Sequence, residues 1–295
     1  MRIATNSARV RVPATSGNLG PGFDAMGMAH DLWDDVSVRV TTGASAVEIR
    51  GEGADTLPRD ESHLILQAMY ATLDRIQAPH AGFELICHNN IPQGRGLGSS
   101  AAAIVAGIML VRGLIDHPQE LDDDLVLQIA TELEGHPDNA APAIFGGAVL
   151  SWSSGEKTHS VHLQVRPDIH TTLLVPREVL ATSAARAALP VQVPHADGAF
   201  NSARAALLVH ALARAPQLLF DATEERLHQG YRAESMPHSA RVLAALRNAG
   251  WPAVVSGAGP SLLVFAKLDE RITQVLAAEG FRAIPSQQVR GAYLI

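Results

Sequence analysis

The segment PQGRGLGSSAA, residues 92–102, decides how the rest of the chain is interpreted. Its three glycines allow sharp backbone turns and let a ligand approach the main chain without a Cβ in the way. Two serines follow, and they begin an apolar stretch that predicts a helix from residue 99 to about 115. The first N–H groups of a helix are unpaired and its dipole favours negative charge, so this junction predicts a phosphate-binding site. A tight strand-to-helix turn with a serine cap explains the same residues without a ligand.

Two common nucleotide-binding motifs do not fit this loop. The P-loop motif requires Gly-Lys-Ser/Thr, but the two lysines of the chain, Lys157 and Lys267, are both far away in the sequence. A dinucleotide fingerprint requires a strand carrying an acidic residue about 20 residues further on. Residues 117–124 instead begin another helix. Bound phosphate would therefore be held by backbone amides, hydroxyl groups, Arg95 or a metal ion.

The composition excludes several classes of protein. With 295 residues, of which 47% are hydrophobic, the chain can bury a core as one large domain or as two lobes. A net charge of −7 with dispersed arginines argues against a nucleic-acid partner, and the single cysteine, Cys87, excludes an internal disulfide. The chain start lacks a signal-peptide core, and the apolar stretch at 101–111 is shorter than the ~20 residues of a membrane span. We therefore expect a cytoplasmic protein.

Hydrophobic periodicity predicts a mixture of helices and strands. Strands are expected at residues 8–12, 36–40, 46–49, 82–87, 145–152, 161–165, 171–175, 253–255 and 262–266. Helices are expected at residues 61–76, 99–115, 122–133, 181–188, 199–213, 222–229, 239–248 and 271–279. Because helices and strands do not alternate strictly, this pattern predicts an α+β fold. A boundary near residue 170 would divide it into lobes at residues 1–170 and 171–295.

A magnesium site needs few protein ligands, because Mg²⁺ prefers oxygen atoms and usually keeps several waters. One hydroxyl and one carboxylate suffice, and Ser100 and Glu132 are the candidates. Glu132 lies off the stripe of apolar residues that recur every four positions at Leu121, Leu125, Ile129 and Leu133. A solvated surface glutamate explains Glu132 equally well.

Three further segments are rich in turn-forming or polar residues. They are VPATSGNLGPGFDAMG at 12–27, EGHPDNAAP at 134–142 and SGAGPS at 256–261. Each alone is an ordinary turn sequence, and the second does not have the spacing of a zinc motif such as HExxH. These segments become informative only when they are considered together and in their order along the chain.

In this order, the glycine-serine loop and these segments resemble the GHMP kinase superfamily, which includes galactokinase, homoserine kinase, mevalonate kinase and phosphomevalonate kinase. Within it, PATSGNLGPGFD, GHPDNAAPAIFGG and the ATSAARAALP segment at 181–190 are similar to the homoserine kinases. The resemblance covers nearly the whole chain. It implies phosphorylation of the side-chain hydroxyl of L-homoserine by ATP, a step of threonine biosynthesis. It also implies an N-terminal ATP-binding lobe like ribosomal protein S5 domain 2 and a ferredoxin-like C-terminal lobe.

The same resemblance implies a role for each matching residue. The ATP phosphates would contact Pro92, Gly94, Arg95, Gly96, Leu97, Gly98, Ser99, Ser100 and Ala101, with Mg²⁺ on Ser100 and Glu132. Homoserine would be bound by Asn18, Asp24, His136, Arg186 and Arg232. Asn18, Asp24, Asn139 and Thr182 would act near the transferred phosphoryl group. The chain departs from the family at Ala184–Ala185, where Lys-Glu is frequent, and at His63, where the adenine pocket often has Asn.

The expected pocket residues match the charges of homoserine. Asp24 could bind the ammonium group, while Arg186 and Arg232 could grip the carboxylate, although both arginines could equally be surface residues. Phosphoryl transfer requires mainly alignment and charge neutralisation, so no strong base is needed. Asp24 is the one candidate base, and we expect it to position the substrate.

Two other functions remain compatible with the sequence. A kinase of the same superfamily could act on another alcohol such as mevalonate, but mevalonate kinases place a lysine near the hydroxyl and this chain has none before Lys157. A nucleotide-binding regulator without catalysis is the alternative from another class. No membrane or nucleic-acid partner is expected, and a homodimer is compatible with the sequence.

Overall fold

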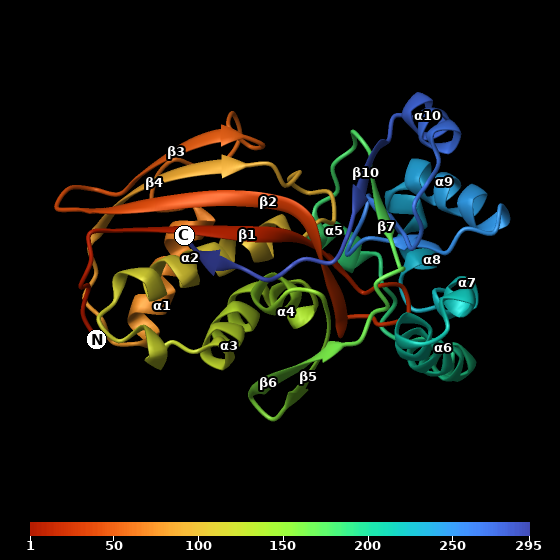
Figure 1. Ribbon diagram of the computed structural model, residues 1–295, viewed down its shortest axis with the longest axis horizontal. Helices are drawn as coiled ribbons and strands as arrows, with labels where there is room; N and C mark the ends of the chain where they lie inside the picture. Colours follow the sequence, from red (N-terminus) through yellow and green to blue (C-terminus); the bar gives the residue numbers. More distant parts are fainter.

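The alternating runs near the amino terminus form two long antiparallel strands, β1 (Ser7–Gly17) and β2 (Met26–Thr41), which organise the first lobe. The computed structural model describes residues 1–295 (Figure 1). The first sheet has the order β11-β1-β2-β4-β3, and a hairpin extends it from the inner end of β2. Its other strands are β3 (Ala46–Gly51), β4 (Gly82–Asn89), β5 (Ala148–Ser154), β6 (Lys157–Leu163) and β11 (Tyr293–Leu294). Only β3 and β4 pair in parallel; the others are antiparallel.

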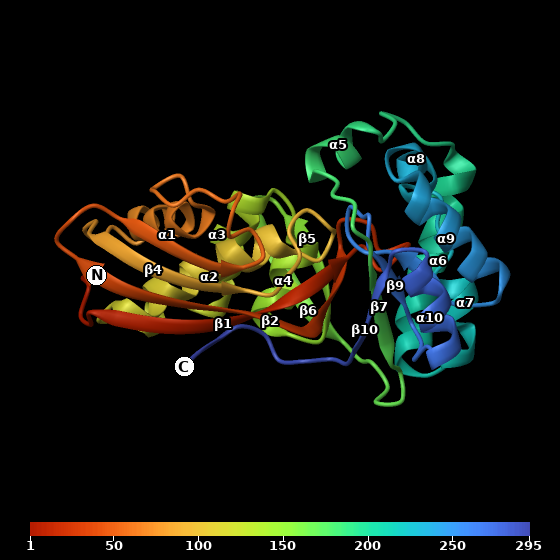
Figure 2. The same cartoon turned by 90° about the horizontal axis from the view of Figure 1, so that it is seen from above.

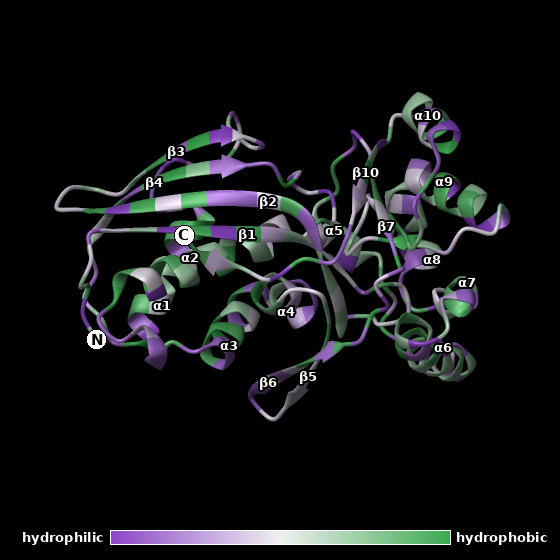
Figure 3. Ribbon diagram, viewed as in Figure 1, coloured by the Kyte–Doolittle hydropathy of each residue, from purple (hydrophilic) through white to green (hydrophobic).

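Four helices cover one face of this sheet and bury its apolar side chains (Figure 1). They are α1 (Leu64–Arg75), α2 (Ser99–Leu114), α3 (Asp123–Glu134) and α4 (Pro137–Phe145). Successive side chains of a strand point to opposite faces, so Val36 and Val38 are buried while Arg39 is exposed. Figure 3 shows this change between hydrophobic and hydrophilic residues along β2. Helix α2 is buried along nearly its whole length, as its apolar sequence predicts.

The second lobe is a four-stranded antiparallel sheet with helices on its outer side. Its strands β7 (Thr171–Val175), β8 (Ala253–Val255), β9 (Leu262–Val264) and β10 (Arg282–Ser286) have the order β10-β7-β9-β8. Figure 2 shows the sheet between the first lobe and the helices α6 (His195–Ala213), α7 (Leu219–Ala222), α9 (Pro237–Asn248) and α10 (Glu270–Ala278). This is the β-α-β-β-α-β arrangement of a ferredoxin-like fold. The expected α+β fold with two lobes is confirmed.

The two lobes are connected by more than one crossing of the chain. The strand β7 begins next to the expected boundary at residue 170, but the last residues return to the first sheet, where β11 pairs with β1. Buried residues of the second lobe, including Leu208 and Val254, belong to the same apolar cluster as the core of the first lobe. The terminal strand therefore lies outside the lobe in which the sequence placed it.

One expected helix and the expected start of one strand are wrong. Residues 222–229 do not form a helix, because α7 ends at Ala222 and the short helix α8 (Gln229–Arg232) begins separately. The carboxylate of Glu225 accepts the N–H groups of residues 227–229, and these hydrogen bonds fix the start of the separate helix α8. Phe145, the expected start of a strand, is instead the last residue of α4. Pro137 begins α4, since the first turn of a helix does not need its N–H groups.

No helix is long and apolar enough to cross a membrane. The other helix of the second lobe, α5 (Thr182–Ala187), lies over the junction of the two lobes (Figure 2), and only its Ala185 is buried.

Candidate active site

The glycine-serine loop meets the start of α2 in a left-handed backbone conformation. Gly96 has φ 70° and Gly98, the residue before the helix, has φ 67°. A glycine has no side chain with which to cap the helix, so the first N–H groups of α2 remain free for an anion. Neither lysine of the chain lines the space beside this loop.

The loop is held by a turn of the second lobe. The hydroxyl of Ser256 donates to the Gly96 carbonyl at 2.6 Å, and the Ser261 N–H donates to the Arg95 carbonyl at 3.2 Å. A Cβ on Gly96 would collide with the Ser256 carbonyl oxygen and lie 2.8 Å from the nitrogen of Gly259. Close backbone approach therefore requires glycine here.

A buried chain of hydrogen bonds extends from this turn through the first lobe. Because the Ser256 proton goes to Gly96, Ser16 donates to Ser256 at 2.6 Å, and His30 donates through Nε2 to Ser16 at 2.8 Å. The other ring nitrogen, Nδ1, then accepts from Ser286 at 3.2 Å. Burial lowers the pKa of His30 to about 3. Neutral His30 thus connects the loop to β10 of the second lobe.

A carboxylate lies opposite the first turn of α2, but it is not the expected one. Ser100 donates through Oγ to Glu134 at 2.8 Å, and Glu134 lines the pocket. Burial raises the pKa of Glu134, and the hydrogen bond from Ser100 opposes that shift. The expected ligand Glu132 is exposed and lies 3.4 Å from Arg75. Two positions along a helix turn by about 200°, so Glu132 points away from the site, and its placement with Ser100 is wrong.

The start of α4 contributes a second acidic group. Asp138 is 2% exposed and accepts from His136 at 2.6 Å and from the Asn139 amide at 3.3 Å. Burial lowers the pKa of His136, but the hydrogen bond and charge of Asp138 outweigh it, so the net shift is upward. Thr15 donates to Asn139 at 3.0 Å. These contacts hold the imidazole and the amide at the pocket wall.

Asp24 and Arg186 contact each other directly across the pocket. The guanidinium of Arg186 donates to both carboxylate oxygens of Asp24, at 2.9 and 3.2 Å. Asp24 follows β1 in the first lobe, whereas Arg186 belongs to α5. Both side chains are about one third exposed, so solvent can reach the pair. The sequence placed both residues in the pocket but did not predict this contact.

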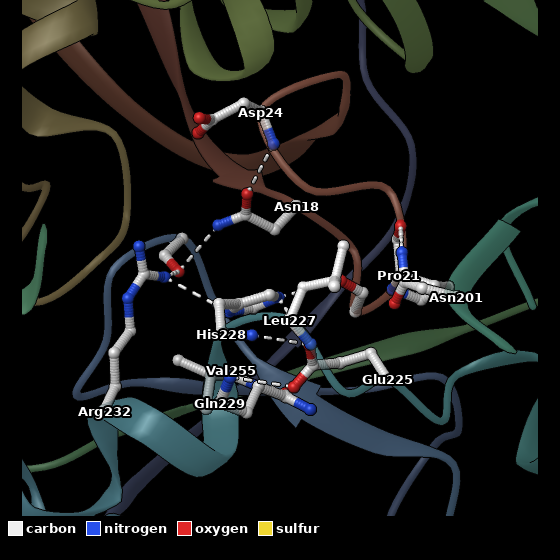
Figure 4. A network of polar contacts seen from close by, with 12 residues as sticks. Asn18, Pro21, Asp24, Asn201, Glu225, Leu227, His228, Gln229, Arg232 and Val255 are labelled. Atoms are coloured by element: carbon white, nitrogen blue, oxygen red, sulfur yellow. Dashed lines mark hydrogen bonds and ion pairs between the residues drawn. The ribbon is translucent and has the colours of Figure 1, made fainter. Parts of the chain in front are cut away.

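Arg232 and Asn18 complete the wall on the side of α8 (Figure 4). Arg232 is 2% exposed, yet it lies beside no carboxylate within salt-bridge distance. The Asn18 amide donates to the Gly257 carbonyl at 2.8 Å, and its oxygen accepts the Asp24 N–H at 2.9 Å. Asn18 therefore fixes the backbone that carries Asp24.

These groups surround one narrow pocket between the lobes. The expected residues that line it are Asn18, Asp24, Gly94, Gly96, Gly98, Ser99, Ser100, His136, Asn139, Thr182, Arg186 and Arg232. The sequence analysis missed four lining residues, namely Glu134, Asp138, Gly257 and Ala258.

The remaining expected residues lie elsewhere. Leu97 and Ala101 are buried in the core, and Pro92 lines a separate cavity. Arg95 lines the same separate cavity and donates to the carbonyls of Pro176 and Arg177, so its guanidinium points away from the pocket.

The chain is similar in sequence to known kinases. The family description "GHMP kinases N terminal domain" matches residues 63–147, and "GHMP kinases C terminal" matches residues 203–279. A homoserine kinase of Streptomyces avermitilis is 48% identical over 98% of this chain and 96% of its own length. The chain belongs to the homoserine kinase family. A homoserine kinase of Streptomyces coelicolor is 49% identical over 89% of this chain and 85% of its own.

Solved structures place this homoserine kinase family member in the same fold. The crystal structure of homoserine kinase from Cytophaga hutchinsonii has a TM-score of 0.85 at 27% identity and covers 99% of this chain and 98% of its own. A mevalonate diphosphate decarboxylase from Staphylococcus aureus has a TM-score of 0.67 at 14% identity, which shows likeness of fold alone.

The oxygen atoms beside α2 suit a magnesium ion in this family member. No group of three or more His, Cys, Asp or Glu is placed to hold a metal. A hydroxyl and a carboxylate, from Ser100 and Glu134, are however within 2.8 Å of each other at the helix start. Mg²⁺ is commonly held by one or two carboxylates together with substrate phosphates and water.

Proposed function

We propose that this protein transfers the γ-phosphoryl group of ATP to the side-chain hydroxyl of L-homoserine, a step of threonine biosynthesis in the cytoplasm. The observation that supports this most is the composition of the pocket. The free N–H groups of α2 and the glycine-serine loop meet side chains of both charge signs in the same narrow space. An anionic donor and a zwitterionic acceptor require that combination.

The donor phosphates would lie on the loop from Gly94 to Ser100. The backbone N–H groups there are preorganised, and the turn at Ser256 prevents the loop from shifting. Ser100 and Glu134 are the side chains that would hold Mg²⁺. When bound there, Mg²⁺ would supply positive charge that neutralises the phosphates during transfer. The raised pKa of Glu134 is consistent with a partly buried carboxylate that lacks a full cationic partner in the protein.

The acceptor would be held by its two charged groups. Arg186 and Arg232 can bind the carboxylate, while Asp24 can bind the ammonium group. Since Asp24 and Arg186 pair with each other, homoserine would replace one ion pair by two new ones, each with a substrate group of opposite sign. That exchange leaves neither Asp24 nor Arg186 without a partner and also gives the buried Arg232 a carboxylate, which offsets the cost of an unpaired buried charge.

The transfer itself needs alignment more than base catalysis. A loose transition state has little demand for a deprotonated nucleophile, so Asp24 would orient the substrate. Asn139 and Thr182 line the same pocket as the loop residues and would contact the transferred group. His136 is held by Asp138 in a position to contact the substrate.

A screen for ADP release over four acceptors tests this function. Purified protein with Mg·ATP is offered homoserine, mevalonate, threonine and galactose, and the product is identified by ³¹P NMR. Homoserine should give the highest turnover and a phosphomonoester signal. Preference for mevalonate would move the activity to another kinase of the superfamily, and ATP binding without turnover on any acceptor would indicate a nucleotide-binding regulator.

A further inference from the structure

The guanidinium of Arg232 is buried without a carboxylate partner, and one of its three nitrogens makes no hydrogen bond within the protein. Its Nε donates to the carbonyl of Ala185 at 3.2 Å. Its Nη1 donates to the carbonyl of Gly257 and to the ring of His228, both at 3.2 Å. Nη2 makes no hydrogen bond to the protein, and Arg232 lines the pocket. The free edge of the guanidinium is therefore the part available to a ligand.

The contacts of His228 settle which tautomer it adopts. Nε2 lies 2.9 Å from the Gly20 carbonyl, which can only accept, so Nε2 carries the proton. Nδ1 is then an acceptor, and it receives the N–H of Arg232. The ring is fully buried and stacks on Phe23 at a centroid distance of 5.1 Å, while the Arg232 guanidinium lies 5.6 Å from the same Phe23 ring. Burial lowers the pKa of His228, in agreement with a neutral ring.

The backbone of His228 is fixed independently of its ring. Both oxygens of Glu225 accept N–H groups at the start of α8, from Leu227 at 2.7 Å, His228 at 2.9 Å and Gln229 at 2.8 Å. The side chain of Glu225 is itself only 1% exposed. Figure 4 shows this cluster next to His228 and beside Arg232, at the opposite end of the view from Asp24. The imidazole thus cannot rotate or move without breaking bonds at both ends.

We propose that His228 is a positioning residue for the substrate carboxylate. As a neutral imidazole it accepts one N–H of Arg232 and so turns the free Nη2 edge toward the pocket. This inference rests on the proposed function, because it takes the carboxylate of homoserine as the ligand of Arg232. His228 touches neither substrate nor phosphate, and it acts through the arginine alone.

Two variants of His228 separate positioning from packing. His228→Leu keeps most of the volume but can neither accept from Arg232 nor donate to Gly20. His228→Gln keeps an acceptor and a donor. We expect His228→Leu to raise the homoserine KM by about 10-fold with the ATP KM within about 2-fold, since a misplaced charge-assisted contact costs that much. His228→Gln should restore most of the homoserine KM.

A substrate without the carboxylate gives the decisive comparison. 3-Aminopropanol retains the hydroxyl and amine of homoserine, so His228→Leu should leave its kcat/KM unchanged. Asn201→Ala is the matched control, because the Asn201 amide anchors the neighbouring Pro21 carbonyl at 2.8 Å without touching Arg232. It should not alter the ratio of kcat/KM for homoserine to that for 3-aminopropanol.

The inference would be overturned if His228→Leu lowered kcat/KM equally for homoserine and 3-aminopropanol. It would also be overturned if Asn201→Ala changed the ratio of these two kcat/KM values as much as His228→Leu does. A wild-type homoserine KM in His228→Leu would overturn it as well. If His228→Leu does not fold, His228→Gln is compared with Arg232→Ala. A Gln variant as impaired for homoserine as Arg232→Ala overturns the inference, and a nearly wild-type one supports it. Wild-type protein that fails to phosphorylate homoserine would refute the proposed function itself, which is a separate result.

Discussion

Replacing one glutamate of α3 should abolish most of the activity, while replacing another glutamate two positions away should do nothing. Glu134→Gln keeps the shape and an oxygen that can still accept from Ser100 at 2.8 Å, but it removes the negative charge. Losing a metal-binding charge at a preorganised site lowers turnover by ~10²-fold or more, about 2.7 kcal/mol in the barrier. We expect that loss in kcat with Mg·ATP.

Glu132→Gln is the matched control on the same helix. Glu132 lies 3.4 Å from Arg75 at the surface, and both side chains are about half exposed. Such a pair contributes at most about 1 kcal/mol to stability and none to the chemistry. Its turnover should equal that of the wild type.

Steady-state ADP release at varied Mg²⁺ concentration, with thermal unfolding of both variants, measures the difference. Burial raises the pKa of Glu134, so the charged form of this side chain is disfavoured in the folded protein, and Glu134→Gln should unfold no earlier than the wild type. Normal turnover in Glu134→Gln, or equal impairment of Glu132→Gln, would refute the assignment of the metal site.

Two further perturbations test the loop and its buried support. Gly96→Ala should raise the ATP KM at least ~10-fold, because the added Cβ would meet the backbone of the Ser256 turn. Gly155→Ala is the control, since Gly155 also has a positive φ of 62° but has nothing within 4 Å of an added Cβ. This control should cost only about 1 kcal/mol of stability and leave ATP binding unchanged. His30 has a pKa of about 3 in the folded protein against about 6.5 unfolded, so its contribution is complete above pH 6.5 and is lost as the pH falls toward 3. Between pH 7 and pH 5, the free energy of unfolding measured in urea should therefore fall by about 2 kcal/mol more for the wild type than for His30→Leu. If the two proteins lose the same free energy of unfolding over this pH range, His30 is not buried as a neutral ring.

Elements with strong local periodicity were predictable from the sequence. The helix after the glycine-serine loop was expected at 99–115 and spans Ser99–Leu114. The strand at 253–255 has the expected bounds. In both cases the local pattern and the tertiary packing agree, because each element is apolar along its length and buried.

The buried face of α3 could not be predicted from apolar residues that recur every four positions. Each step of four advances the helix by about 40° beyond a full turn, so Leu133 has rotated away from the core and is 42% exposed. The buried face instead contains Leu127 and Ala130, and Glu134 follows them at spacings of seven and four. A count based on that spacing would have selected Glu134 instead of Glu132.

Contacts between residues far apart in the sequence could not be predicted from local sequence patterns. The ion pair of Asp24 with Arg186 joins residues 162 positions apart, and no local signal indicates that these two oppositely charged pocket residues bind each other. The return of the terminal strand to β1 likewise depends on tertiary packing. The acid at Asp138 was within a segment recognised as polar, but its burial beside Gly17 and Gly27 is a property of the folded backbone.

The most direct test of the account is the ratio of kcat/KM for homoserine to that for 4-hydroxybutyrate, which lacks only the amine, at saturating ATP. If Asp24 binds the ammonium group while Arg186 and Arg232 bind the carboxylate, losing the amine removes a contact of roughly 1.5–3 kcal/mol and lowers kcat/KM by about 10- to 100-fold. Mevalonate, which also lacks the amine, should be no better. A ratio near one, or a preference for mevalonate, would contradict recognition of a zwitterion and with it the assignment of homoserine as the substrate.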